Sequence, residues 1–191
     1  SGRGEGLYIW PAGGLMMPML IGGVAAVAAL GAAIVAGQDP NYRIERSVNI
    51  KASSSAIFAI LRDFLQFEHW SPWEKLDPKM QKTFEGETAA VGSYYHWAGN
   101  KQVGEGTMTV VEVQPDEGID LRLEFFRPFP SQALVRWSVA PAGDGSQIVT
   151  WSMKGKHANF MAKAFGSVMK SMLGKNFDEG LARLKAFCEK S

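Results

Sequence analysis

The chain has 191 residues, a length suited to one ordinary domain with an additional segment. Hydrophobic residues make up 46% and charged residues 20% of it, which excludes an intrinsically disordered chain. The net charge is +1 and the basic residues are spread along the sequence, so we expect no nucleic-acid partner. The single cysteine, Cys188, cannot form an internal disulfide.

The chain begins with a segment unlike the rest. Leu15–Ala36 contains no charged residue and is long enough, at ~1.5 Å per residue, to cross a bilayer as a helix. We expect residues 15–37 to be a single-pass membrane anchor, after a tag-like or flexible start at residues 1–14 and before a linker at residues 38–41. A cleaved signal peptide and a buried core helix are the alternatives. The side of the membrane stays open, and small residues in the segment would allow two copies to associate.

The first elements of the following domain are a strand and helical turns. Apolar and polar residues alternate from Tyr42 to Ile50, which predicts a strand. Ser53–Ser55 then offers N-caps for a helix that runs through Leu61. The aromatic stretch Asp63–Trp73 predicts a second short helix or a loop, broken at Pro72.

A series of strand-like runs follows Pro78, with turn residues between the runs. Their apolar and polar residues alternate in the manner of antiparallel strands with one covered and one wet face. This phase puts Tyr95, Trp97, Trp137 and Trp151 on the covered face and His96 on the other. The runs are residues 81–87, 93–97, 104–114, 119–126, 133–139 and 146–153.

The last element is a long amphipathic helix, predicted from Asn159 to Glu189. Its apolar residues fall at three- and four-residue steps, and Cys188 lies among them as a packing thiol. Asn159 is the expected N-cap. Helices kept to one side of an antiparallel sheet define the α+β class.

Several short motifs occur in this same order. They are Arg43–Ser47, Trp70–Pro78, Tyr95–Asn100, Val103–Gly106, Phe126–Phe129, Val149–Trp151 and Phe177–Leu181. Together they resemble the SRPBCC superfamily of START-like domains, in its polyketide cyclase/dehydrase-like branch, over residues 42–190. The resemblance implies a helix-grip fold, a curved antiparallel sheet wrapped around the long C-terminal helix, here preceded by one hydrophobic N-terminal helix. That superfamily includes lipid carriers, cyclases and chaperone co-factors, so the likeness fixes no single activity.

The space between sheet and helix is the expected binding site. Aromatic and methionine side chains would give it an adaptable apolar wall, although core packing is the competing interpretation for part of the set. For Trp70–Trp73 the competing interpretation is a turn that plugs one end of the core. The expected ligand-binding residues are Trp70, Trp73, Tyr95, Trp97, Phe125, Trp137, Trp151, Met153, Met161, Phe165 and Met169.

The sequence contains no constellation typical of a catalytic or metal site. The three histidines, His69, His96 and His157, lack metal-binding spacing, and we expect no metal and no cofactor. The catalytic candidates that can be named are Tyr95, Glu105 and Arg127. For Glu105, which lies between two glycines, the competing interpretation is a solvated strand residue.

We therefore expect a non-enzymatic module that binds a small hydrophobic or lipid-like ligand at the membrane, as a carrier, a sensor or a sequestering protein. One alternative is an enzyme of the cyclase, dehydratase or hydrolase type that acts on an apolar substrate. A second is a protein-interaction module similar to chaperone activators. The cavity wall separates the first two hypotheses, because converging ionisable groups favour an enzyme, whereas Trp, Phe and Met with one polar group favour a carrier.

Overall fold

The computed structural model describes residues 30–37, 39–157, 163 and 166–190. The chain divides between Gln38 and Asp39, and the sheet belongs to the second unit. Residues 30–37 are helical, while the rest of the predicted anchor, residues 15–29, lies outside the described residues. Among the helices that are described, none combines the length and the apolar character needed to cross a bilayer.

The second unit is built on one seven-stranded antiparallel sheet with the order β1-β7-β6-β5-β4-β3-β2. Each strand-like run of the sequence forms a strand, with ends that differ by a few residues from those expected. The first strand pairs with the last, from Asn41 opposite Lys156 to Ile50 opposite Gln147. The strands are β1 (Asn41–Ile50), β2 (Gln81–Glu85), β3 (Tyr94–Ala98), β4 (Glu105–Gln114), β5 (Gly118–Arg127), β6 (Ser131–Pro141) and β7 (Gln147–Lys156).

Short helical elements connect β1 to β2. They are α2 (Ser54–Leu61), η1 (Phe64–Gln66), α3 (Phe67–Trp70) and η2 (Pro72–Lys75). Ser53 is the N-cap of α2, and its hydroxyl accepts the Ala56 backbone N–H at 3.2 Å. The stretch predicted as a short helix or a loop is thus a chain of single turns, and the last of them begins at Pro72.

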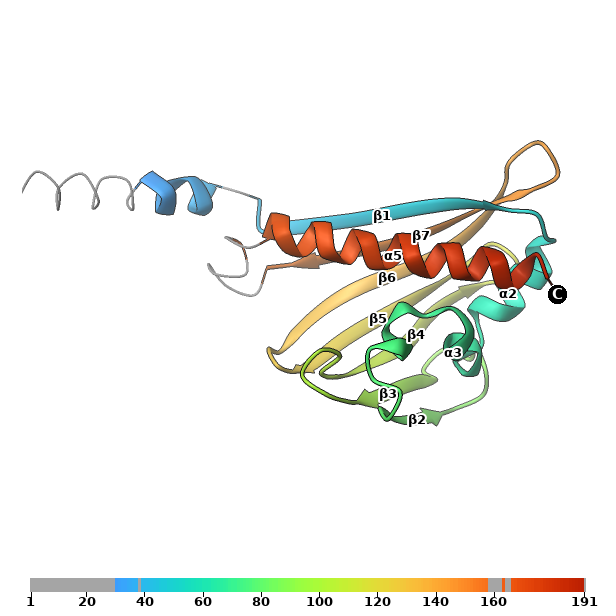
Figure 1. Cartoon of the computed structure of the whole chain (residues 1–191), viewed down its shortest axis with the longest axis horizontal. Coiled ribbons are helices and arrows are strands. Elements are labelled where there is room, and N and C mark those ends of the chain that lie inside the picture. Colours follow the sequence, from blue (N-terminus) through green and yellow to red (C-terminus); the bar gives the residue numbers. More distant parts are fainter. Residues whose placement is uncertain (1–29, 38, 158–162, 164–165, 191) are drawn as a thin grey trace, which may run out of the picture. The chain divides into compact units, whose positions relative to one another are not determined.

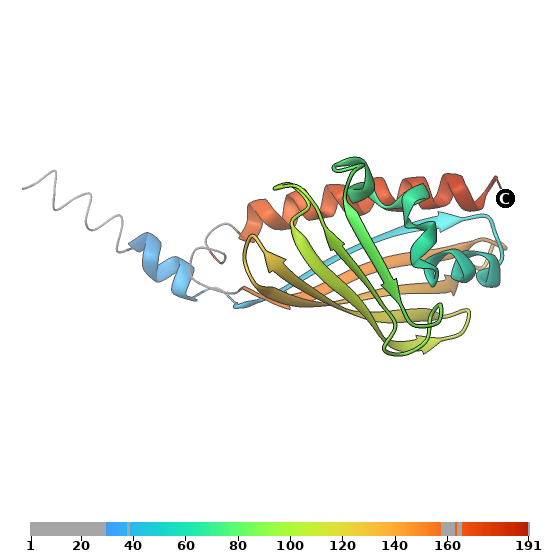
Figure 2. The ribbon, with the colours of Figure 1, turned by 90° about the horizontal axis from the view of Figure 1, so that it is seen from below.

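The long helix α5 (Gly166–Cys188) lies across the concave side of the curved sheet (Figures 1 and 2). Its predicted start at Asn159 lies outside the described residues. Two polar contacts fix α5 along β1: Arg46 Nε donates to Asp178 Oδ2 at 3.2 Å, and Lys185 Nζ donates to the Asn49 carbonyl at 2.5 Å. Phe177, Leu181 and Leu184 turn inward and are buried. A curved antiparallel sheet with one long C-terminal helix is the helix-grip fold, so that expectation is confirmed.

Candidate functional site: a cavity between the sheet and α5

A cavity of about 520 Å³ lies between the concave face of the sheet and α5. This volume is within the range of ~300–1,000 Å³ that is usual for small-molecule sites. Its wall comes from the inward faces of β3 to β7, from α3 and η2, and from the first half of α5. The cavity is therefore bounded by elements from nearly the whole length of the second unit.

Eight of the expected ligand-binding residues line this cavity: Trp70, Trp73, Tyr95, Trp97, Phe125, Trp137, Trp151 and Met153. Met161 and Phe165 lie outside the described residues. Met169 does not line the cavity and is 41% exposed. It shares a helical face with Met172 and Leu173, which do line the cavity, but it lies one turn closer to the start of α5, beyond the cavity wall.

The sequence reasoning missed part of the wall. Leu123 and Val135 share a strand phase with Phe125 and Trp137, so the alternation could have identified them. Met108 was harder to find because the β4–β5 register shifts on either side of it, near Gly106 and after Val110. The missed apolar residues are Phe67, Leu76, Met80, Val103, Met108, Leu123, Val135, Met172, Leu173 and Phe177, and the polar ones are Ser71, Glu74, Gln102 and Asn176.

Three tryptophans form the aromatic centre of the wall. The rings of Trp70, Trp137 and Trp151 meet pairwise edge to face, with centroids 5.4 to 5.8 Å apart. Such edge-to-face pairs add specific geometry to the burial of large apolar area. All three side chains are nearly inaccessible to bulk solvent, so this part of the wall is packed in place before any ligand arrives.

The indole N–H groups of these three tryptophans have no hydrogen-bond acceptor among the described residues, although all three are buried. Trp97 differs, because its indole N–H donates to the Val103 carbonyl at 3.1 Å. A buried donor without an acceptor costs ~1–3 kcal/mol. The three indole nitrogens have almost no accessible surface, so their N–H groups are enclosed in the packed tryptophan cluster and do not face the open cavity.

Glu74 supplies the carboxylate of the wall. Lys82 Nζ lies 2.7 Å from its Oε2, and the Tyr95 hydroxyl donates to its Oε1 at 3.4 Å. The Glu74 side chain is only 11% exposed, so the charge of Lys82 offsets that of a largely buried carboxylate. Burial, and then the negative charge of Glu74, raise the pKa of Tyr95, so its phenol stays protonated and remains a donor.

The other named catalytic candidates lie away from the cavity. Arg127 Nε donates to Glu105 Oε2 at 2.5 Å, and His96 Nε2 lies 3.5 Å from Glu105 Oε1. These side chains belong to the opposite strand phase from Tyr95 and Trp97, which places them on the outer face of the sheet. Glu105 and Arg127 are therefore a surface ion pair, and the solvated alternative describes Glu105 correctly.

The remaining histidines pack on aromatic rings. His69 stacks on Phe187 and His157 lies against Tyr42. No cluster of three or more metal-binding side chains occurs in the part of the chain that the structure describes. A shallower hollow of about 380 Å³ on the outer face, beside His96 and Tyr94, is lined by polar side chains and open to solvent. The cavity under α5 is thus the better enclosed site.

Comparison with known proteins agrees with this architecture. The family described as polyketide cyclase/dehydrase and lipid transport matches residues 42–189. None of the curated proteins matches the chain in sequence.

Solved structures share the fold at low sequence identity. The aromatase/cyclase Zhui from Streptomyces sp. R1128 is 14% identical with a TM-score of 0.58, and the match covers 78% of this chain and 94% of that one. A protein of Thermobifida fusca is 21% identical with a TM-score of 0.56, and the match covers 75% of this chain and 90% of that one. A protein of Chromobacterium violaceum is 15% identical with a TM-score of 0.55, and the match covers 78% of this chain and 97% of that one. At such identities the likeness shows the fold alone.

Proposed function

Since the chain belongs to the polyketide cyclase/dehydrase and lipid transport family, we propose that its cavity holds a small hydrophobic or lipid-like molecule, as a carrier, sensor or sequestering protein. The observation that carries this proposal is the composition of the wall. Among the described residues, aromatic, methionine and aliphatic side chains make up most of it, and Glu74 is the single carboxylate. Such a wall favours an apolar ligand held in place by a few polar contacts.

The polar side chains of the wall refine the proposed ligand. Gln102 and Asn176 line the cavity, and their amide groups can donate and accept hydrogen bonds. A ligand with a carbonyl or similar oxygen on an apolar frame would pair with one of these amides, whereas a pure hydrocarbon would not. The proposed ligand is therefore apolar with a hydrogen-bond acceptor.

We further propose a location at the membrane. Its support is the uncharged run Leu15–Ala36, which precedes the domain. In this proposal residues 15–37 anchor the chain, and the domain exchanges its ligand with the bilayer. Self-association through the small residues of that segment is a further prediction.

Native mass spectrometry of the 191-residue chain, released from detergent, tests the ligand proposal. We expect bound small molecules on the wild type and reduced occupancy in Met172→Trp, because Met172 lines the cavity and a larger side chain would narrow its entrance. Met169→Trp is the matched control, three residues away on the same helix but outside the cavity wall. Equal occupancy in the two variants would contradict the assigned cavity.

A second candidate function is an enzyme of the cyclase or dehydratase type. The observation that favours it is the contact between Tyr95 and Glu74, which puts a protonated phenol beside a largely buried carboxylate in the wall. The molecules recovered from wild type and from Glu74→Gln separate the two functions. An enzyme would yield an unconverted compound from the variant, whereas a carrier would yield the same compound from both.

A further inference from the structure

One end of the Asp39–Ser191 unit is formed by the β3–β4 and β5–β6 hairpins, the last residues of β7 and the starts of β1 and α5 (Figure 1, left of the sheet). Asn41 of β1 lies opposite Lys156 of β7 at this end. We call it the mouth end, because the exposed residues of the cavity wall, Leu76, Gln102 and Met172, lie toward it. Asn100 Nδ2 donates to the Leu76 carbonyl at 3.0 Å and so ties this rim to the β3–β4 hairpin.

Exposed apolar side chains gather at the mouth end. Phe126 and Phe129 on the β5–β6 hairpin are 47% and 75% exposed. Val168 and Met172 on the first turns of α5 are 68% and 57% exposed. In the described part of the opposite end, the large exposed apolar side chains are Leu65 and Val91. Phe126 stacks on His96 of the outer face, so the exposed apolar side chains that remain for a partner at the mouth end are Phe129, Val168 and Met172.

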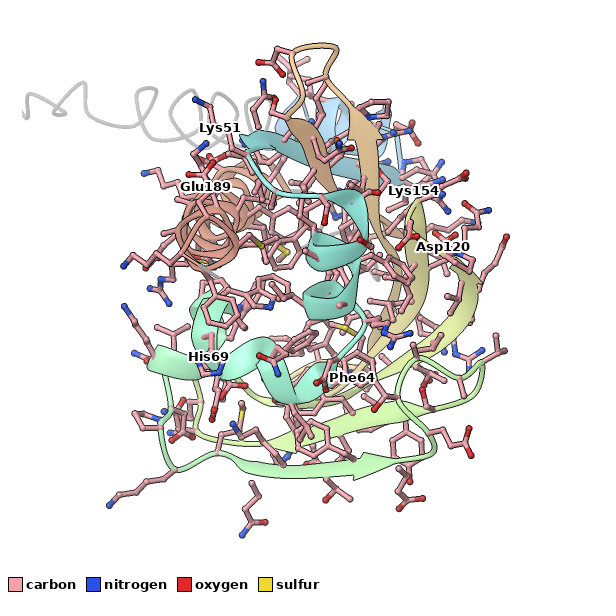
Figure 3. The ribbon with its side chains drawn as sticks, turned by 90° about the vertical axis from the view of Figure 1, so that its right-hand side faces the viewer. Lys51, Phe64, His69, Asp120, Lys154 and Glu189 are labelled. Carbon is pink, nitrogen blue, oxygen red and sulfur yellow. The ribbon has the colours of Figure 1, made fainter. Side chains whose placement is uncertain are left out.

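The charges divide between the same two ends. The exposed lysines at the mouth end are Lys79, Lys101, Lys156 and Lys170. Arg127 is exposed there too, but it is paired with Glu105. The acids at this end are the exposed Asp39 and the half-buried Asp77. The opposite end faces the viewer in Figure 3, which labels Lys51 and Glu189 there. Glu189 is paired with Lys185. The helices, turns and strand ends on that side of the fold add the exposed acids Glu68, Glu87, Glu112, Asp116, Glu117 and Asp144, against the exposed cations Arg62 and Lys190. The net charge of the chain is near zero, but basic side chains predominate at one end of the domain and acidic side chains at the other.

We propose that the mouth end docks on an anionic lipid surface, with the cavity entrance toward the lipid. Aromatic and aliphatic side chains enter the headgroup region, while lysines and arginines beside them pair with anionic headgroups. The mouth end supplies both kinds of side chain around one opening. The chain also enters β1 at this end, at Asn41, directly after the uncharged run and linker of the sequence.

The basic side chains of the mouth end and the point at which the chain enters the domain both favour an anionic lipid surface. A membrane anchor that joins the domain at Asn41 would hold the mouth end, and not the acidic end, closest to the bilayer. The proposal goes beyond ligand binding and does not depend on it, because surface contact is measured separately from cavity occupancy.

The test uses the 191-residue chain inserted in vesicles, with an environment-sensitive fluorophore on Phe129→Cys. Cys188 is buried and its pKa is raised to about 11, so the introduced thiol is the reactive one. On vesicles of phosphatidylcholine with phosphatidylglycerol we expect a blue-shifted emission and protection from aqueous iodide. On phosphatidylcholine alone, or at high salt, both effects should be much smaller.

Two matched controls define the result. Leu65→Cys, labelled in the same way at the acidic end, should stay in water on both vesicle types. Lys156→Glu with Lys170→Glu should abolish the shift at position 129, while Arg62→Glu with Lys190→Glu should preserve it. If the fluorophore at position 129 stays in water on anionic vesicles, or if its emission shifts equally on neutral ones, the proposal is overturned. An acidic protein would then be the partner to test at this surface.

Discussion

Trp151 of β7 and Phe177 of α5 stack face to face, with ring centroids 4.3 Å apart and planes 12° from parallel. Gly180, on the next turn of α5, permits this approach. A Cβ at Gly180 would lie 2.9 Å from Trp151 Cζ3 and 3.1 Å from Pro72 Cδ. The Trp151–Phe177 stack and the absence of a Cβ at Gly180 therefore set the distance between α5 and this part of the cavity wall.

Gly180→Ala should destabilise the domain. The helix would gain ~1 kcal/mol from alanine, but overpacking against an immobilised indole costs ~1–3 kcal/mol. Gly174→Ala is the control on the same helix, since its Cβ would meet only the flexible end of the Arg46 side chain and would cost at most the exposed Arg46–Asp178 ion pair, worth ~0–1 kcal/mol. Chemical denaturation should show a lower midpoint for Gly180→Ala and an unchanged or higher one for Gly174→Ala. The reverse order would mean that the stack does not limit the approach of α5.

Asn176→Leu should weaken binding of an apolar ketone about fivefold more than binding of the matching hydrocarbon. The substitution keeps the approximate size of the side chain but removes the amide that faces the cavity, and one hydrogen bond is worth ~1 kcal/mol. Lys175→Leu is the control, because Lys175 is exposed and lies outside the cavity wall. Fluorescence titration with both probes gives the comparison. Equal weakening of both probes would show that Asn176 makes no hydrogen bond to the ketone.

A chain that begins at Asp39 should fold by itself. The sheet, the helices that cover it and the match to the family all lie between Asn41 and Glu189. We expect one cooperative transition on thermal unfolding, with far- and near-ultraviolet circular dichroism changing together. An insoluble product, or one that keeps helical signal without fixed aromatic signal, would contradict this.

Stability should fall at alkaline pH because of Cys188. Burial raises the pKa of this thiol from 9.0 to about 11, so the folded state holds a proton that the unfolded state releases first. The contribution of Cys188 is complete below pH 9 and is lost as the pH rises from 9 to about 11. Cys188→Ala should show a shallower loss of denaturation midpoint over this interval. An identical slope in wild type and variant would assign the alkaline loss to other groups.

The sequence by itself determined the order of strands and helices and the inward phase of Tyr95, Trp97, Trp137 and Trp151. Successive side chains of a strand point to opposite faces, so alternation identifies the covered face before any partner strand is known. For Glu105 the alternation alone was not sufficient, because the glycines on either side interrupt it. The β3–β4 register of the structure shows that Glu105 lies on the opposite face from these aromatics.

Tertiary structure alone decided which residues of the right phase reach the cavity. Met169 and Met172 share one face of α5 and both are exposed, yet only Met172, one turn further along the helix, lines the cavity. Glu74 lies in a short turn without periodicity, and it becomes the carboxylate of the wall because η2 packs beside Tyr95, 21 residues later in the chain. The alternation of apolar and polar residues predicts which way a side chain faces on its own strand or helix. Whether that side chain lines an enclosed cavity depends on contacts between segments that are distant in the sequence, which no local pattern encodes.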